Sequence, residues 1–320
     1  MNVLSLFDGI SCGQIALERA GINVVNYFAS EIEGSAIAIT QRNYPNTIQL
    51  GDVKELTIEK LKQLPKIDLL IGGSPCQGFS RNGKSLNFED PRSKLFFEYV
   101  RILNYLKEHN NADIIFLLEN VHMKKEYRDI ISEHLGVEPI DINSKLLSAQ
   151  NRPRLYWTNL PITPPGDKGV HLIDILDDAD LTCEIANNLS FDPAIPKAAR
   201  DLVSVCDTGI RVKQATKQGY IEAVNGDGIN LSFPTSKTRR GRVIKGKSNT
   251  LDCSCAGSVY HDGIIRNFTV NELEKLQTLP VGYTEGIPLK DRKHAIGNGW
   301  TVDVIAYIFT TKRGGSNETL

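Results

Sequence analysis

The sequence predicts an α/β protein, with a doubly wound, Rossmann-like sheet and a second, smaller domain. Strand and helix patterns alternate over roughly the first 160 residues, which is typical of a parallel sheet covered by helices. The runs Asp68 to Ile71 and Ile114 to Leu118 have the character of strands that are buried on both faces. Beyond Pro161 the alternation stops, and short strand patterns with many turns follow.

Each element of the first part has its own signal. Val3 to Phe7 is an apolar run that ends at a turn, so we expect the first strand there. Ile15 to Ala20 continues as a helix, and Gly21 is well placed as its C-cap. Further strands or strand ends are expected at 24–29, 49–53, 68–71 and 114–118, and helices up to 43, at 58–64, 94–107, 270–279 and 301–310.

These patterns divide the chain into three parts. We expect a first domain at 1–163, a smaller domain with a hinge at 164–289, and a segment at 290–320 that returns to the first domain. A proline-rich linker around Pro164 marks the first boundary. At roughly 150 residues per domain, a chain of 320 residues has room for two.

The composition is that of a globular protein, with 41% hydrophobic and 23% charged residues. No apolar run approaches the roughly 18 residues that a membrane span needs, so we expect no membrane association. The six cysteines form neither a disulfide framework nor a zinc-ligand pattern. We therefore expect an intracellular protein without a bound metal, in which an unusual cysteine is a candidate nucleophile.

Positive charge is concentrated in one stretch. The net charge is −1, yet Asp207 to Lys247 carries nine Lys or Arg against three Asp or Glu. Such a patch on a nearly neutral chain suits nucleic acid, although a solvated loop is an equally good interpretation from charge alone.

Chemically useful residues follow the predicted strands, where doubly wound sheets bind ligands. Glu31 follows the second strand and is well placed to accept hydrogen bonds from ribose hydroxyls. The loop from Asp8 to Gly13 lacks the G-x-G-x-x-G pattern, which disfavours a dinucleotide. With Asp52 at a third strand end, we favour an adenosine-containing cofactor without a diphosphate.

Two further strand ends carry groups for catalysis. Cys76 follows a buried strand in a polar loop, where a thiolate could act as a nucleophile; a buried core thiol is the alternative. Glu119 ends the next strand and could exchange a proton with a bound ring, or could cap the following helix. Arg152 and Arg154 are spaced to share one face of a strand, as a substrate clamp or as an exposed edge.

Together these motifs resemble the DNA (cytosine-5)-methyltransferase family, which uses S-adenosylmethionine. Ser74 to Ser80 (SPCQGFS) is similar to its nucleophile motif, Glu119-Asn120-Val121 to its acid motif, and Gln150-x-Arg152-x-Arg154 to its arginine motif. Arg266 to Pro280 resembles its late helix motif, and Gly297-Asn298-Gly299-Trp300 its C-terminal motif. One departure is Ser11, which stands where the family's F-x-G-x-G loop commonly has its second glycine.

The resemblance implies a Rossmann-like methyltransferase domain, a target-recognition domain, and methylation of cytosine C5 in duplex DNA. Cys76 would attack C6 of a flipped-out base, Glu119 would protonate N3, Arg152 would bind the O2 edge and help fix Glu119, and Arg154 would support the site. S-adenosylmethionine would bind to Phe7, Asp8, Gly9, Ile10, Gly13, Glu31, Ile32, Asp52, Val53, Pro75, Asn298, Gly299 and Trp300. DNA would contact Ser80, Arg81, Lys237, Arg239, Arg240, Arg242 and Lys247.

The same ring chemistry would serve cytosine in tRNA, which is the alternative substrate. The continuation Gln77 to Ser80 looks more like the DNA enzymes. A zinc deaminase is disfavoured, because its H-x-E and P-C-x-x-C motifs are missing. We expect a monomer in the cytoplasm or nucleoid of a microbial or virus-infected cell. The sequence leaves open a restriction-modification, orphan phage or regulatory role.

Overall fold

The computed structural model describes residues 1–75, 94–178, 183–186 and 189–310, and these fall into two compact units. The first unit comprises Met1–Asn143, Pro153–Gly166 and Gly299–Leu320, and the second comprises Ser144–Arg152 and Asp167–Asn298. This division differs from the expected boundaries at three places: residues 144–152 and 290–298 group with the second unit, and residues 164–166 group with the first.

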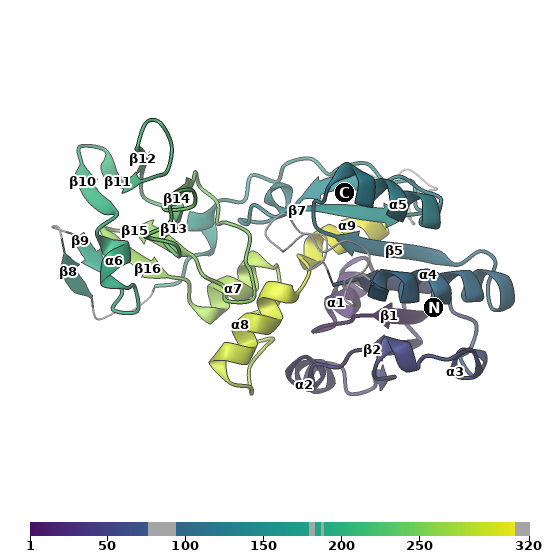
Figure 1. Ribbon diagram of the computed structural model, residues 1–320. Helices are drawn as coiled ribbons and strands as arrows, with labels where there is room; N and C mark the ends of the chain where they lie inside the picture. Colours follow the sequence, from purple (N-terminus) through teal and green to yellow (C-terminus); the bar gives the residue numbers. More distant parts are fainter. Residues whose placement is uncertain (76–93, 179–182, 187–188, 311–320) are drawn as a thin grey trace. The chain divides into compact units, whose positions relative to one another are not determined.

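The first unit is built on a seven-stranded sheet in the order β3-β2-β1-β4-β5-β7-β6 (Figure 1). The strands are β1 (Asn2–Leu6), β2 (Asn26–Ser30), β3 (Ile48–Gln49), β4 (Leu69–Gly73), β5 (Ile115–Asn120), β6 (Ile140–Asn143) and β7 (Pro153–Thr158). The first five are parallel, while β7 runs antiparallel to both β5 and β6. The predicted doubly wound α/β fold is therefore confirmed, with an antiparallel edge that the sequence analysis does not predict.

Helices accompany these strands, and all except η1 and α5 lie close to where the sequence predicts a helix. They are α1 (Cys12–Arg19), α2 (Gly34–Asn43), η1 (Val53–Glu55), α3 (Ile58–Lys62), α4 (Lys94–His109), α5 (Lys125–Leu135) and α9 (Val302–Thr310). α1 ends where Gly21 adopts a φ of 64° and its N–H binds the carbonyl of Glu18. Ala20 is the C-cap, so Gly21 stands one position later than expected, in the left-handed conformation that favours glycine.

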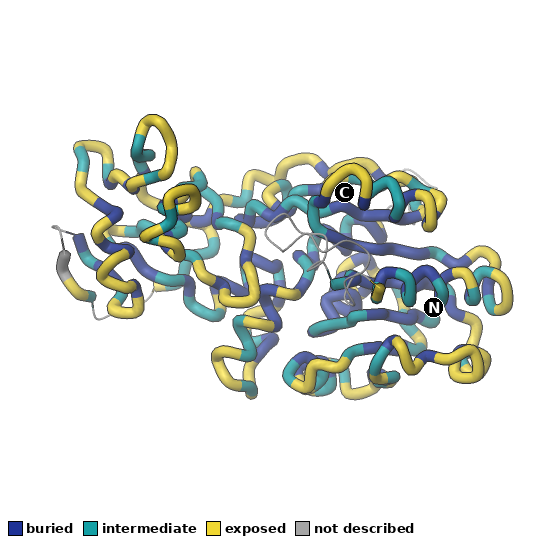
Figure 2. The backbone as a smooth tube through the Cα atoms, in the orientation of Figure 1, coloured by how far each residue is buried: buried dark blue, intermediate teal, exposed yellow. Residues whose placement is uncertain are grey.

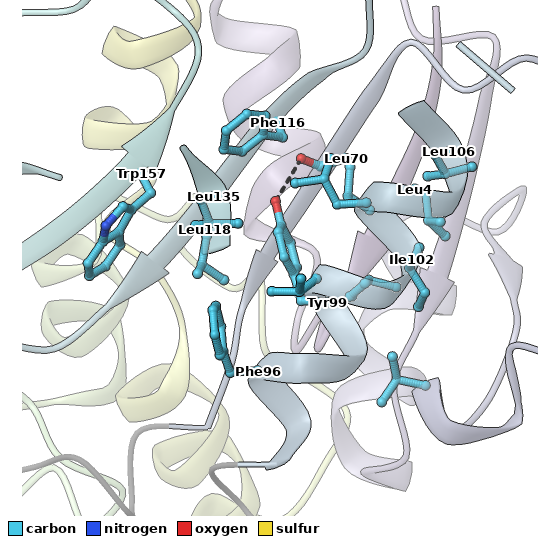
Figure 3. Packing of buried hydrophobic residues seen from close by; sticks show 14 of the residues in the cluster. Leu4, Leu70, Phe96, Tyr99, Ile102, Leu106, Phe116, Leu118, Leu135 and Trp157 are labelled. Carbon is cyan, nitrogen blue, oxygen red and sulfur yellow. Dashed lines mark hydrogen bonds between the residues drawn. The ribbon is translucent and has the colours of Figure 1, made fainter. Parts of the chain in front are cut away.

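A hydrophobic core fixes the middle of this sheet against α4 and α5. Figure 3 shows Phe96, Tyr99 and Ile102 of α4 packed with residues of β1, β4 and β5. The Tyr99 hydroxyl donates a hydrogen bond to the carbonyl oxygen of Leu70, at 3.4 Å. The strands of the sheet are mostly buried (Figure 2), so their carboxyl ends stand on a rigid base.

The second unit contains two smaller sheets. A three-stranded sheet joins β10 (Val203–Cys206), β11 (Gly209–Lys213) and β12 (Tyr220–Ala223). A six-stranded sheet has the order β14-β13-β15-β16-β9-β8. Its strands are β8 (Glu184–Ala186), β9 (Leu189–Phe191), β13 (Asp227–Asn230), β14 (Arg242–Ile244), β15 (Ser258–His261) and β16 (Ile264–Asn267). The unit also holds η2 (Ser144–Leu146), η3 (Leu172–Ile175), α6 (Lys197–Arg200), α7 (Val270–Leu276) and α8 (Leu289–Asn298). It has its own hydrophobic core around Phe191, Ile210 and Ile265.

Within the described ranges, no helix combines the length and apolar character needed to cross a bilayer.

Candidate active site

Glu119 lies at the carboxyl end of β5 and is held on both of its oxygens. Arg154 Nε lies 2.9 Å from Oε1, and the indole Nε1–H of Trp300 donates to Oε2 at 3.1 Å. The carboxyl group is largely shielded, since Glu119 is 9% exposed. A carboxyl group that is shielded from water and held by an arginine and an indole N–H has a fixed orientation, unlike a carboxyl group on the open surface.

The sheet register explains why Arg154 reaches this acid. Glu119 pairs with Tyr156 across β5 and β7, and Arg154 lies two residues from Tyr156 on the same face. From the sequence we expect Arg152 to help fix Glu119 and Arg154 to support the site. β7 begins at Pro153, so Arg152 precedes the strand and groups with the second unit. There its guanidinium donates to the carbonyl oxygens of Leu251 and Gly297, at 2.8 and 3.1 Å.

A second set of hydrogen bonds ties the end of β4 to the end of β5. The side-chain amide of Asn120 donates to Ser74 Oγ at 3.0 Å and to the Ser74 carbonyl oxygen at 3.3 Å. Both residues are buried. This bond fixes the chain immediately before Pro75, which is half-buried. The nucleophile and DNA residues predicted at Cys76, Ser80 and Arg81 lie outside the described residues.

The loop after β1 alternates between ordinary and left-handed backbone. Phe7, Gly9 and Ser11 have φ values of 58°, 60° and 54°. Ser11 thus adopts the conformation that glycine would adopt without strain, at the position where the sequence departs from the family's pattern. Its hydroxyl donates to Asp8 Oδ2 and lies 3.2 Å from Thr40 Oγ1, so side-chain hydrogen bonds stabilise the strained residue.

Asp8 is the centre of a small polar network in this loop. Its Oδ1 accepts a 2.7 Å hydrogen bond from the Tyr27 hydroxyl. Burial raises the pKa of Asp8 to about 6, and the nearby Glu31 carboxylate adds to the rise, while hydrogen bonds from Ser11 and Tyr27 oppose it. The sequence analysis did not identify Tyr27, because an aromatic residue inside a strand gives no signal of a polar role.

Glu31 is oriented by backbone donors. Its Oε2 accepts from Gly9 N–H at 2.7 Å, and its Oε1 accepts from Ile32 and Glu33 N–H at 2.7 and 2.9 Å. Ile32, the next residue, exposes 68% of its surface. An oriented carboxylate beside an exposed apolar side chain suits a ligand that has hydroxyl groups next to a flat apolar ring.

The other predicted cofactor residues are distributed as follows. Asp52 caps η1 by accepting the Lys54 N–H at 3.0 Å, and Val53 is buried behind it. Ile10 is buried, so its side chain belongs to the core. A Cβ at Gly13 would lie 2.5 Å from Ile71 Cδ1, so this glycine is required for packing. Gly299 and Trp300 belong to the first unit and Asn298 to the second, where Asn298 Oδ1 accepts from Cys253 Sγ at 3.0 Å.

Gln150 of the arginine motif and the late helix motif are structural in the second unit. Gln150 donates to the Leu276 carbonyl at 3.0 Å and to Gln277 Oε1 at 3.1 Å, and it accepts from Leu251 N–H at 3.0 Å. Arg266 and Glu272 form a buried pair through two hydrogen bonds, at 2.6 and 2.8 Å. These motif residues hold the unit together.

The basic residues of the second unit differ in their environments. Lys237 and Arg242 are exposed, and the Arg239 guanidinium lies over the Phe233 ring, 4.6 Å from its centroid. Arg240 Nε donates to the Gln214 carbonyl at 3.4 Å. Lys247 is different, because its ammonium group donates to the carbonyl oxygens of Lys145, Ser148 and Val170.

An ammonium group has three N–H donors, and these three carbonyls can use all of them. Burial lowers the pKa of Lys247. The expected phosphate contact of Lys247 conflicts with this arrangement, and the structure gives the residue a role within its own unit. Among the described residues, no group of three or more His, Cys, Asp or Glu side chains could hold a metal ion.

The solved structures that resemble this chain establish the fold. A DNA modification methyltransferase encoded within an E. coli prophage has a TM-score of 0.66 at 21% identity, over 98% of this chain and 99% of that one. A mutant of Spodoptera frugiperda DNMT2 has a TM-score of 0.62 at 20% identity, over 97% and 98% of the two chains.

The sequence relatives match one part of the chain. The orphan methyltransferase M.SPRI of Bacillus phage SPR is 37% identical over 169 residues, which cover 49% of this chain and 37% of its own. The type II methyltransferase M.NgoBV of Neisseria gonorrhoeae is 33% identical over 180 residues, covering 49% of this chain and 41% of its own. The match therefore spans less than half the length of these relatives. Residues 1–157 match the model of the C-5 cytosine-specific DNA methylase family, the family that the motifs of the sequence resemble.

Proposed function

We propose that this chain transfers a methyl group from S-adenosylmethionine to C5 of cytosine in duplex DNA. The observation that carries the proposal is the arrangement around Glu119, whose two oxygens bind Arg154 and Trp300. This acid stands next to the end of β4, from which the chain leads through Ser74 and Pro75 to Cys76. An acid and a nucleophile on neighbouring strand ends are what addition to a pyrimidine ring requires.

The first unit also fits the cofactor. After accepting its three backbone donors the Glu31 carboxylate keeps a lone pair on Oε2 for a ribose hydroxyl, and the exposed Ile32 suits an adenine face. Asp52 uses Oδ1 to cap η1, and Oδ2 would accept the adenine amino group. Phe7, Gly9 and the residues after them would hold the methionine end through the backbone. When bound, S-adenosylmethionine supplies an electrophilic methyl group.

The chain's own residues would perform the remaining chemistry. The Cys76 thiolate forms a bond to C6 while Glu119 gives a proton to N3, which makes C5 a carbon nucleophile. After C5 is methylated, a base removes its hydrogen, the C6–S bond breaks, the thiolate is restored, and the N3 proton returns to Glu119. Arg154 would hold Glu119 and direct further N–H donors to the O2 edge of the base.

The second unit would bind the DNA. Lys237, Arg239, Arg240 and Arg242 lie on or beside the segment that joins β13 and β14, where they would contact phosphates. The target base must leave the duplex, since a thiolate can attack C6 only from the ring face.

Covalent trapping tests this function. The protein is incubated with S-adenosylmethionine and mixed-sequence duplex DNA that carries 5-fluorocytosine, whose fluorine cannot leave as a proton does. We expect an adduct that survives denaturation and maps to Cys76 by intact and peptide mass. Cys76→Ala should form none, whereas Cys206→Ala, which removes a thiol of the second unit, should form it at the wild-type level.

A fluorinated RNA pool is run in parallel. An adduct with RNA alone would replace duplex DNA by RNA as the substrate. Absence of any adduct, together with absence of methyl transfer to unmodified DNA and RNA pools, would contradict the proposed function.

A further inference from the structure

We propose that Trp300 is a positioning residue for Glu119, and that its indole N–H, together with Arg154, directs the Glu119 proton toward the base. This inference rests on the proposed function and adds to it. The resemblance to the methyltransferase family places Trp300 at the cofactor. The hydrogen bond between Trp300 Nε1 and Glu119 Oε2 instead connects it to the acid.

The contact joins parts of the first unit that are held rigidly. Trp300 lies two residues before α9, an apolar helix whose buried residues include Val302, Val304 and Ile305. α9 is fixed to α1 by the ion pair between Asp303 and Arg19, at 2.6 Å. Glu119 is the penultimate residue of β5, an interior strand of the sheet. The indole therefore has a fixed direction of approach to the carboxyl group.

The chemistry of the two partners decides where a proton on Glu119 can stand. Trp and Arg side chains are hydrogen-bond donors only, so neither can accept a proton from the carboxyl group. The Arg154 guanidinium forms an ion pair with Oε1, and Trp300 occupies a lone pair of Oε2. A proton on Glu119 must therefore occupy one of the remaining lone pairs, which point away from both donors. Each oxygen of Glu119 thus has a separate partner, Arg154 at Oε1 and Trp300 at Oε2.

Gly73 makes this approach possible. It pairs with Glu119 in the register of β4 and β5. A Cβ at this position would lie 2.9 Å from Trp300 Nε1 and 3.0 Å from Glu119 Oε2. The absence of a side chain at the end of β4 therefore leaves room for the hydrogen bond between the other two residues.

The two possible roles of Trp300 differ in which step they affect. A residue that only binds the cofactor would change the Kd of S-adenosylmethionine. A residue that positions the acid would change the step in which Cys76 adds to the base and N3 is protonated. That step can be followed without methyl transfer, by using cytosine that carries tritium at C5. After Cys76 adds to C6, a solvent proton adds to C5, the tritium leaves C5, and the thiolate is eliminated, so that tritium appears in the water.

The experiment compares Trp300→Phe with Trp157→Phe. Both variants lose an indole N–H that donates to an oxygen in the first unit. The Trp157 N–H binds Ser132 Oγ at 3.0 Å; Trp157 pairs with Leu118, so its side chain lies on the face of the sheet opposite Glu119. Tritium release is measured with S-adenosylhomocysteine and randomised duplex DNA, or RNA if trapping identifies RNA. The Kd of S-adenosylmethionine is measured by calorimetry, and folding by circular dichroism.

For Trp300→Phe we expect tritium release and kcat to fall about ten- to a hundredfold, as for a displaced catalytic group, with the Kd of S-adenosylmethionine within about threefold of wild type. Trp157→Phe should keep wild-type release. Gly73→Ala keeps all three side chains but separates Trp300 from Glu119, so it should show the same loss as Trp300→Phe.

Normal tritium release in Trp300→Phe with a weakened Kd would overturn the inference and leave Trp300 as a cofactor residue. Equal losses in both tryptophan variants would also overturn it, because the loss would then not be specific to Glu119. If the wild-type protein releases no tritium from DNA or RNA, the proposed function itself fails and the inference fails with it.

Discussion

The Tyr27 hydroxyl donates a 2.7 Å hydrogen bond to Asp8 in the loop that follows β1. The phenol partly compensates for the burial of a carboxyl group whose pKa is raised to about 6. A group with this pKa is mostly ionised at neutral pH in spite of its burial, so the loop carries an energetic cost there. This cost, the hydrogen bonds of Glu31 and Lys247, and the exposure of Lys237 and Arg242 each lead to a testable prediction.

Asp8→Asn should stabilise the protein at neutral pH relative to acid pH. The native pKa of Asp8, about 6, exceeds the ordinary 3.8, so the folded state binds more protons than the unfolded state between these values. Wild-type stability from this group is therefore present at low pH and lost as pH rises through 6. From pH 4 to pH 7.5, the free energy of unfolding of the variant minus that of the wild type should increase by about 2 kcal/mol. Urea unfolding at a series of pH values measures this.

The amide can accept from Tyr27 and donate to Ser11, so the hydrogen bonds survive the substitution. Asp113→Asn, at an exposed carboxyl of the same unit, controls for the loss of one charge. A difference between Asp8→Asn and wild type that does not change with pH would disprove the burial argument.

Glu31→Gln should weaken S-adenosylmethionine binding. Both oxygens of Glu31 accept backbone N–H donors, and an amide would place its NH₂ group against one of them. Such a mismatch costs about 1–3 kcal/mol, which corresponds to about a ten- to a hundredfold rise in Kd. Calorimetry measures the Kd, and Glu33→Gln, an exposed neighbour whose side chain makes no cap hydrogen bond, is the control. If the two variants have the same Kd for S-adenosylmethionine, Glu31 does not bind the cofactor.

Lys247→Met should destabilise the second unit without changing the salt dependence of DNA binding. The methionine keeps an unbranched apolar side chain but leaves the carbonyls of Lys145, Ser148 and Val170 without their donor. We expect a loss of about 1–3 kcal/mol in the free energy of unfolding, measured with urea. If the salt dependence of the Kd for DNA is reduced and the free energy of unfolding is unchanged, Lys247 contacts DNA and this prediction is wrong.

Lys237→Ala combined with Arg242→Ala should weaken DNA binding and reduce its salt slope. Both residues are exposed, and each phosphate contact contributes roughly 0.9 to the slope of log Kd against log salt, so the slope should fall by about two. Fluorescence anisotropy over a range of salt concentrations gives both quantities. Lys197→Ala removes an exposed charge from α6 and should change neither the slope nor the Kd.

Local signals predicted much of the first unit. Apolar runs and turn residues gave β1, β4 and β5 to within a few residues, because strands buried on both faces need continuous apolar sequence. Strand ends then indicated Glu31, Asp52 and Glu119, since the carboxyl ends of parallel strands share one edge.

Contacts between distant residues were not predictable in this way. Trp300 and Glu119 are 181 positions apart, and only the folded sheet brings them together. Arg152 and Arg154 look equivalent in the sequence, but the start of β7 at Pro153 separates their environments. Lys237 and Lys247 likewise have the same charge, and only the carbonyl groups around Lys247 distinguish them. Residue type gives the possible chemistry, while the neighbours determine which possibility is used.

The first unit is assembled from three separate stretches of the chain, and the last of them carries Trp300 and α9. During synthesis on a ribosome, Glu119 and Arg154 emerge before the whole of 167–298 is made, and Trp300 emerges after it. A nascent chain therefore lacks the second donor to its acid until the whole of 167–298 has been synthesised. The order of synthesis would therefore delay docking of α9, and with it the completion of the Glu119 environment, until the second unit has been made.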